Sequence, residues 1–162
     1  MSTNNYKPHI HVLPEDDANR QIANGFLLNP DINGRVIQIL PPVGGWSKVI
    51  EEFKSVHALE MRKYSERRIV LMIDFDNQAD RLNCVKSEIP KELSDRVFIL
   101  GVLSDPEKLN ANLNRKGLEN IGTFLSKDCS DNTRKTWGHN LLKHNQTELD
   151  RMVSSVKPFL FH

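Results

Sequence analysis

A run of five apolar residues followed by two spaced aspartates limits most strongly what this chain can fold into. Residues 69–77 read IVLMIDFDN. The apolar run is too short for an isolated helix and rich in β-branched side chains, which predicts a strand buried on both faces, as in a parallel sheet covered by helices. Asp74 and Asp76 follow at its carboxyl end, and in an extended chain residues two positions apart point to the same face.

Two carboxylates on one face repel each other unless a cation, a basic side chain or a proton neutralises them. The carboxyl ends of strands are where open α/β sheets bind ligands, and carboxylate oxygens are preferred ligands of Mg²⁺ and Mn²⁺. We therefore interpret Asp74 and Asp76 as a divalent-metal site. Capping of the next helix is the simpler alternative, although a cap needs only one acid.

The first two thirds of the chain alternate strand and helix patterns. Strands are predicted at 9–13, 35–40, 69–73 and 96–103, and helices after the first three at about 18–27, 46–64 and 78–89. This order predicts a three-layer α/β/α fold on a four-stranded parallel sheet, in an order such as 2-1-3-4. With strands one and three adjacent, their carboxyl ends flank a topological switch point.

Residues 104–162 are expected to form a helical cover on the same core. A helix starts at Asp105, a short helix contains Ile121, residues 126–135 form a polar loop, and two more helices are separated by a break at Asn145. Residues 1–162 are thus predicted to be a single domain with its α/β core at 8–103. Cys84, on a helix, and Cys129, in the polar loop, lack the spacing of a disulfide framework or a structural zinc site.

The charge balance argues against a strongly basic surface. The formal net charge is +1, from 22 basic and 21 acidic residues, so nucleic-acid binding would need a local basic face. No apolar run approaches the roughly eighteen residues of a membrane span, and the polar first residues lack a signal-peptide core. We expect a soluble, cytoplasmic protein without membrane contact; its oligomeric state stays open, with a homodimer as one alternative.

Other residues with site chemistry follow the predicted strands. Glu15 comes after the first strand and faces the aspartates if strands one and three are neighbours. Gly44 and Gly45 follow the second strand and form either a turn or a phosphate cradle. Asp80 either supports a second metal or caps a helix. The candidate phosphate contacts are Lys48, Arg81 and Arg134.

Two histidines on the first strand form a second candidate site. His9 and His11 lie two positions apart and therefore share one face of the strand. Such a pair is compatible with zinc, but a zinc site needs further ligands. With no third ligand in view, packing or exposure at a sheet edge is the preferred interpretation.

The combination of motifs resembles the Toprim domain, which is shared by type IA topoisomerases, bacterial primases and OLD-family nucleases. The resemblance covers about residues 8–103: a glutamate closing the first strand, glycines after the second, and an apolar strand ending in Asp-x-Asp with another aspartate downstream. It implies that Glu15 is the catalytic general base. It also implies that Asp74 and Asp76 bind the metal, with Asp80 in support.

The chain differs from the Toprim pattern just after Glu15. Asp16 occupies the position where the family usually has glycine, and the acidic position a few residues later corresponds to Asp17 or Asn19. These differences leave two alternatives, a two-metal nuclease or a Toprim-like fold with weaker metal binding.

The resemblance implies a phosphoryl-transfer reaction on DNA or RNA that depends on Mg²⁺ or Mn²⁺. Tyr6 and Tyr64 do not supply the nucleophile that a covalent topoisomerase needs, so hydrolysis by an activated water, as in a small nuclease, is the expected reaction. Two other functions stay open. One is a non-catalytic interaction module with the same fold. The other is a PIN- or NYN-like ribonuclease, whose acidic strand is normally the first of its domain rather than the third.

Overall fold

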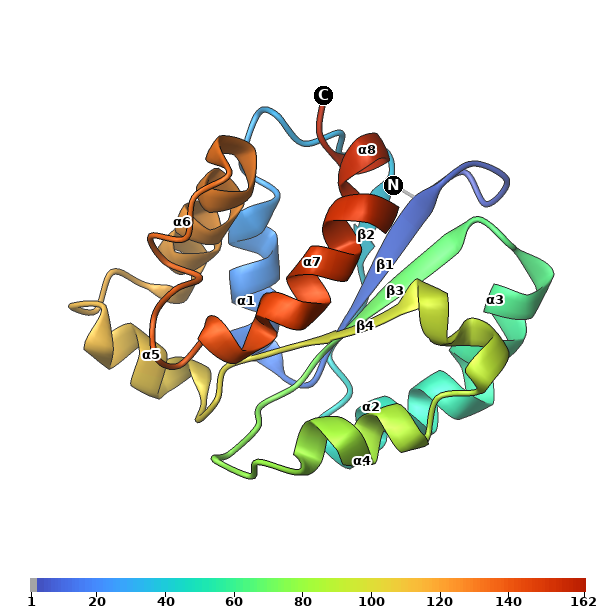
Figure 1. Cartoon of the computed structure of the whole chain (residues 1–162), viewed down its shortest axis with the longest axis horizontal. Helices are drawn as coiled ribbons and strands as arrows, with labels where there is room; N and C mark the ends of the chain where they lie inside the picture. Colours follow the sequence, from blue (N-terminus) through green and yellow to red (C-terminus); the bar gives the residue numbers. More distant parts are fainter. Residues whose placement is uncertain (1–2) are drawn as a thin grey trace.

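The computed structural model describes residues 3–162 and shows a four-stranded, all-parallel sheet (Figure 1). The strands are β1 (His9–Pro14), β2 (Ile37–Ile39), β3 (Arg67–Met72) and β4 (Val97–Leu100). Their order, β2-β1-β3-β4, confirms the predicted order and places β1 beside β3. β1 is buried along its whole length, as expected for a central strand with helices on both faces.

Residues 46–96 cover one face of the sheet. The layer consists of α2 (Trp46–Glu52), a π-helical turn (Phe53–His57), α3 (Ala58–Lys63), α4 (Arg81–Ser87) and a 3₁₀ turn (Lys91–Arg96). The first three segments follow one another without a break and match the helix predicted at 46–64. Apolar side chains of this layer pack on Leu13, Ile69 and Leu71 of the sheet.

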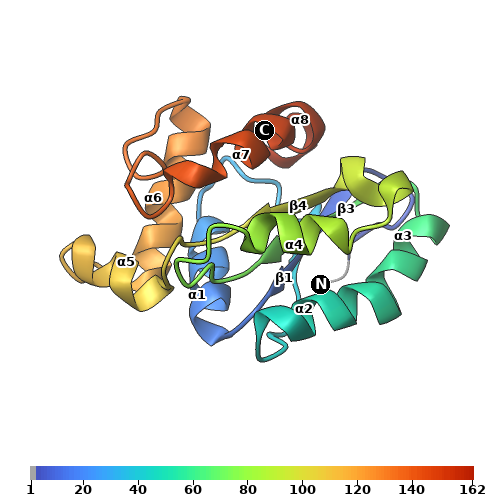
Figure 2. The same cartoon turned by 60° about the horizontal axis from the view of Figure 1, so that its bottom comes forward.

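The other face is covered by α1 and by the tail of the chain. These helices are α1 (Asp17–Phe26), α5 (Pro106–Asn112), α6 (Leu118–Asp131), α7 (Gln146–Ser155) and α8 (Lys157–Leu160). Val156 and Leu160 pack against Ile10 and Val70 of the sheet, so the tail covers the core as predicted. In Figure 2, α7 and α8 lie above the sheet, and α2 and α3 lie below it.

Helices α1 and α6 cross at very close range. At Gly25 a Cβ would overlap the carbonyl oxygen of Glu119, and at Gly122 it would overlap that of Ile22. Only glycine lets the two backbones approach this closely. The crossing fixes the position of α1, whose first turn lies at the carboxyl end of the sheet.

Two helix boundaries differ from those expected. α4 starts at Arg81 rather than near residue 78, because Asp76 and Asn77 adopt positive φ angles of 47° and 58° and form a turn. The polar loop expected at 126–135 is helical as far as Asp131, and Cys129 therefore lies within α6. The polar pattern there is misleading because Asp128 is buried and accepts hydrogen bonds from within the fold.

The tail between α6 and α7 also differs from the sequence-based expectation. Residues 137–142, expected to be the first of two terminal helices, form turns. Trp137 and Leu142 are nevertheless buried in the core. An irregular segment therefore buries apolar residues whose spacing resembles that of a helix. Within the described part of the chain, every helix is too short or too polar to cross a bilayer.

Candidate metal centre

Three carboxylates meet where β1 and β3 end. Glu15 and Asp16 follow β1, and Asp74 follows β3; one oxygen of each lies within 4.8 Å of the others. The register of the sheet explains this meeting, because Pro14 pairs with Met72 and the next residues of both strands leave the sheet side by side. The arrangement offers a cation three hard oxygen ligands at the switch point of the sheet.

Hydrogen bonds hold the three acids in place. The amide of Asp74 donates to Oε2 of Glu15 at 2.7 Å. Asn19, one turn into α1, donates from Nδ2 to Oδ1 of Asp16 and to Oδ1 of Asp74, both at 2.9 Å. Asp16 is also the N-cap of α1, since its Oδ1 accepts from the amide of Asn19 at 3.0 Å. The start of α1 and the end of β3 are therefore joined through side chains.

Asn19 has one further feature that fits a cation. Its side chain is fully buried, and among the described residues its Oδ1 has no hydrogen-bond partner. A buried acceptor without a partner is costly, so such an atom calls for a ligand, an ordered water or a turned amide group. Rotation of the amide by half a turn would bring Oδ1 to the side of Asp16 and Asp74 and add a fourth oxygen to the group.

The electrostatics of the acids follow from their burial. Burial raises the pKa of Asp74 to about 8, and the negative charges of Glu15 and Asp16 act in the same direction. Burial also raises the pKa of Glu15, although the hydrogen bond from the amide of Asp74 opposes the shift. Among the described residues, none of the three forms an ion pair with a basic side chain. A bound divalent cation would supply the missing positive charge.

Asp76 lies outside this group. β3 ends at Met72, and the positive φ of Asp76 breaks the alternation that would have placed it on the same face as Asp74. Its side chain is 54% exposed and forms an ion pair of 2.7 Å with Nη1 of Arg81. The same Nη1 donates to the backbone carbonyl of Asp74 at 2.7 Å, and the guanidinium stacks over Trp46.

The other predicted site residues have different positions. Asp80 precedes α4 and is exposed, and its side chain makes no capping bond. The amides of Gly44 and Gly45 donate to the carbonyl of Glu15 at 2.8 and 3.2 Å, with φ angles of 97° and 156°, so they form a turn that fixes the chain beside the acids. Lys48 is exposed and lies over Gly44.

Arg134 follows α6 on the far side of α1 and is not part of this edge. Asp16 and Asn19 are the members of the site that the metal-site prediction did not include. The sequence does contain a signal for these two residues. Asp16 is a typical N-cap acid, and Asn19, three positions later, shares the first turn of the helix with it. That signal is common to many helix starts and does not by itself indicate a metal.

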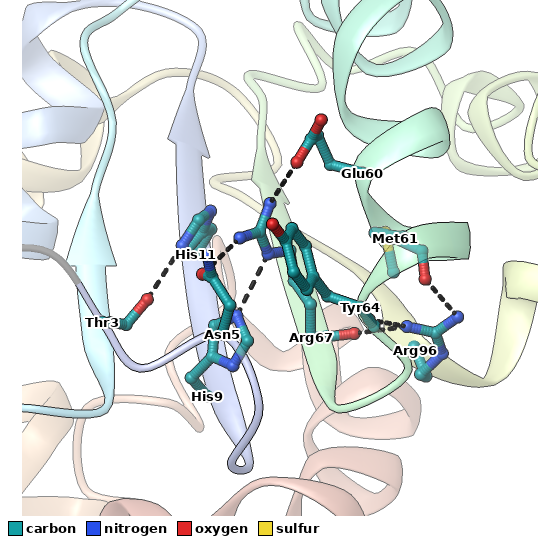
Figure 3. Close-up of polar contacts among 9 residues, drawn as sticks. All are labelled: Thr3, Asn5, His9, His11, Glu60, Met61, Tyr64, Arg67 and Arg96. Carbon is teal, nitrogen blue, oxygen red and sulfur yellow. Dashed lines mark hydrogen bonds and ion pairs between the residues drawn. The ribbon is translucent and has the colours of Figure 1, made fainter.

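A second polar cluster lies at the opposite, amino-terminal end of β1 and β3 (Figure 3). Arg67 is buried and donates from Nε to Nε2 of His9 at 3.0 Å, while Nδ1 of His9 contacts the carbonyl of Lys7 at 2.7 Å. His11 contacts the hydroxyl of Thr3 at 3.3 Å. Within residues 3–162 the one group of three candidate metal ligands is that of the acids at the carboxyl edge, and it contains no histidine. The contacts of His9 and His11 are those of a packed polar cluster.

Comparisons of the chain with protein-family models, with curated proteins and with solved structures found no match. The description of the site therefore rests on its own geometry. That geometry consists of three acids that could hold a metal ion, joined through Asn19 and placed where two central strands end.

Proposed function

We propose that Glu15, Asp16 and Asp74 bind a divalent cation, Mg²⁺ or Mn²⁺, and that the chain uses it for phosphoryl transfer on nucleic acid as a small, Toprim-like nuclease. The observation that supports this proposal is the convergence of three acids, which form no ion pair with a basic side chain among residues 3–162, at the switch point of a sheet with the predicted strand order. Each potential ligand is an oxygen atom, which suits Mg²⁺ and Mn²⁺ rather than a softer metal.

A bound cation would neutralise phosphate oxygens and lower the pKa of an attacking water. The residues of the chain have separate roles. In the metal-free protein Asn19 holds Asp74 and Asp16 through Nδ2, and a half-turn of its amide would replace this donor by an oxygen when the cation arrives. Glu15 is held through Oε2, which leaves Oε1 as the oxygen for the cation or for the attacking water.

Two basic residues at the same edge are the candidates for contacts with the substrate. Lys48 is exposed beside the glycine turn, and among the described residues it forms no ion pair. Arg81 is bonded to Asp76 and Asp74, so its charge is partly compensated. We therefore expect Lys48 to contribute more to nucleic-acid binding than Arg81 does.

A non-catalytic interaction module is the second candidate. The observation that favours it is the ion pair between Asp76 and Arg81, which keeps an acid of the Asp-x-Asp motif away from the other three. In that case the acids would bind a metal, or share a proton, without supporting hydrolysis.

Thermal unfolding with added metal tests the binding site. A ligand that binds only the folded state at 100 times its Kd stabilises it by about 2.7 kcal/mol, which is a Tm rise of roughly 5–11 °C for a chain of this size. Mg²⁺ or Mn²⁺ should produce such a rise at pH 8 in the native protein and not in Asp74→Asn. Asp95→Asn, which changes an exposed acid at the other end of the sheet, should respond like the native protein.

A cleavage assay then separates enzyme from module. Single-stranded, duplex and supercoiled DNA and single-stranded RNA are incubated with the protein and Mn²⁺, Mg²⁺ or EDTA. Cleavage that needs the metal and is lost in Glu15→Gln supports the nuclease. A metal-dependent Tm rise without cleavage of any substrate would support the module, and no Tm rise in the native protein would overturn the metal site.

A further inference from the structure

A cavity of about 300 Å³ opens between α6, α7 and α8, away from the acidic site. A second, smaller cavity of about 100 Å³ lies between these helices, α1 and the sheet. The two cavities share the walls formed by Phe26, Leu100, Trp137, Met152 and Leu160. The same five side chains therefore line both a cavity near the surface and one against the sheet.

The size and lining of this space fit a small molecule. Binding sites for small molecules have volumes of about 300–1,000 Å³ and are mainly apolar with a few polar groups. Here the shared walls are aromatic, Leu and Met side chains, and the polar side chains of the larger cavity come from α6, the residues after it, α7 and the start of α8. Burial of an aliphatic chain in such a space is favoured by the hydrophobic effect.

The polar rim of the cavity favours an anion. Lys157 donates from Nζ to the carbonyl of Cys129 at 2.8 Å and to Oδ1 of Asn132 at 2.6 Å, and both acceptors are neutral. Arg134 is exposed at the same rim. Among the described residues, neither basic side chain lies within 4.0 Å of a carboxylate.

The rim also has two acids, and both accept hydrogen bonds from neutral donors. Asp128 is buried and accepts from the hydroxyl of Thr133 at 2.8 Å and from the amides of Thr136 and Trp137 at 2.7 and 3.0 Å. Asp150 accepts from Gln146 at 2.7 Å. Both oxygens of Asp128 are therefore occupied within the fold, whereas exposed Asp150 retains its charge, so the carboxylate of a ligand is expected on the side of Arg134 and Lys157.

We propose that this cavity binds a small molecule with an aliphatic chain and one carboxylate. The chain lies against Phe26, Trp137 and Met152, and the carboxylate lies at the rim between Arg134 and Lys157. This inference goes beyond the proposed nuclease function and does not depend on the metal.

The two cysteines provide a direct test. Cys129 lines the cavity, whereas Cys84 is exposed on α4 in the other helical layer. Decanoate, at concentrations where it is monomeric, is added to the native protein, and alkylation of each cysteine by iodoacetamide is followed by peptide mass spectrometry. Cys129 should react about tenfold more slowly when decanoate is present at ten times its Kd, because only unoccupied protein reacts. The rate at Cys84 should not change.

Variants and analogues test the two parts of the proposed ligand. Arg134→Gln should weaken decanoate binding by up to roughly fivefold, the upper end of what an exposed ion pair contributes, and should leave the binding of decan-1-ol unchanged. Met152→Trp places a larger side chain in the wall common to both cavities and should abolish protection of Cys129; circular dichroism shows whether this variant is folded. Equal protection of both cysteines, no protection, or protection by decyltrimethylammonium as strong as that by decanoate would overturn the proposal.

Discussion

The amide of Asp74 donates a hydrogen bond of 2.7 Å to Oε2 of Glu15 and so joins the end of β3 to the end of β1. The donor is a backbone group, so the contact persists when the side chain of Asp74 is changed. It favours the ionised form of Glu15, while burial and the neighbouring acids favour the protonated form. The metal-free site is therefore sensitive to pH, and the charge of Asp74 can be removed without dismantling the site.

The first prediction concerns the pH dependence of the metal-free protein. The pKa of Asp74 is about 8 in the folded state and near 3.8 when unfolded, so between these values the folded state holds a proton that the unfolded state loses. This group therefore makes the free energy of unfolding fall as pH rises from about 4 to about 8 and level off above that. Asp74→Asn should remove this contribution and be more stable than the native protein at pH 8.5.

Urea denaturation in EDTA at pH 5 and pH 8.5 measures the effect. One unit of pKa difference corresponds to about 1.4 kcal/mol, so a gain of at least roughly 2 kcal/mol at pH 8.5 is expected for Asp74→Asn. Asp95→Asn should follow the native profile. Parallel profiles for Asp74→Asn and the native protein would contradict the raised pKa.

The second prediction separates Asp76 from the metal site. Because Asp76 pairs with Arg81 and lies outside the group of three acids, Asp76→Asn should keep the full Tm rise with Mg²⁺. Loss of this ion pair, in which Asp76 is half exposed and Arg81 keeps its bond to the carbonyl of Asp74, should reduce stability by about 1 kcal/mol. Thermal unfolding of the variant with and without Mg²⁺ provides the measurement. An abolished Mg²⁺ response would show instead that Asp76 turns inward to bind the metal, as the Asp-x-Asp motif predicts.

The contrast between Asp74 and Asp76 shows how far the sequence predicts this site. The strand was predictable because its apolar run has one physical explanation, burial on both faces, and the parallel sheet followed from the alternation of strands and helices. The order 2-1-3-4 required in addition that strands one and three be neighbours. Asp74 lies close enough to the end of the strand for its position at the carboxyl edge of the sheet to follow from the strand prediction. The position of Asp76 does not follow in this way, because the chain has already entered a turn with positive φ. Asp and Asn adopt such angles more readily than other non-glycine residues, but they are also common elsewhere, so this signal did not outweigh the Asp-x-Asp pattern.

Asn19 shows a second limit. Its importance comes from contacts with Asp16 and Asp74, one of them 55 positions away in the chain. A single sequence contains no pattern for such a contact. The end of α6 was mispredicted for a related reason, since the polar side chain of Asp128 is buried with its own donors and does not mark a solvent-exposed loop.

The third prediction concerns acid stability and the cluster at the other end of the sheet. Burial lowers the pKa of His11 to about 3, and the nearby charge of Arg67 acts in the same direction. As pH falls from about 6.5 to about 3, the unfolded state gains a proton that folded His11 does not, so this group reduces the free energy of unfolding in that range. His11→Gln, which can still bond to Thr3, should lose stability less steeply than the native protein below pH 6.

Urea denaturation at pH 7.5, 6, 5 and 4 follows this difference. At pH 7.5 the variant should be less stable by about 1 kcal/mol, because a buried side chain has been changed. The difference in free energy of unfolding between the two proteins should narrow or reverse by pH 4. Exposed His162→Gln serves as the matched control and should run parallel to the native protein. A constant gap between His11→Gln and the native protein at every pH would contradict the lowered pKa.

The fourth prediction links the crossing of α1 and α6 to the metal site. A Cβ at Gly122 would overlap the carbonyl oxygen of Ile22, so Gly122→Ala should push the helices apart and reduce stability by about 3 kcal/mol or more. Gly34→Ala, where a Cβ would meet no atom within 4 Å, should leave the stability nearly unchanged.

Because Asn19 lies on α1, the same displacement should weaken its hydrogen bond to Asp74. Isothermal titration calorimetry, at a temperature where both variants are folded, measures this effect. Mg²⁺ should bind more weakly to Gly122→Ala than to Gly34→Ala. Equal affinities would show that α1 can move without disturbing the acids.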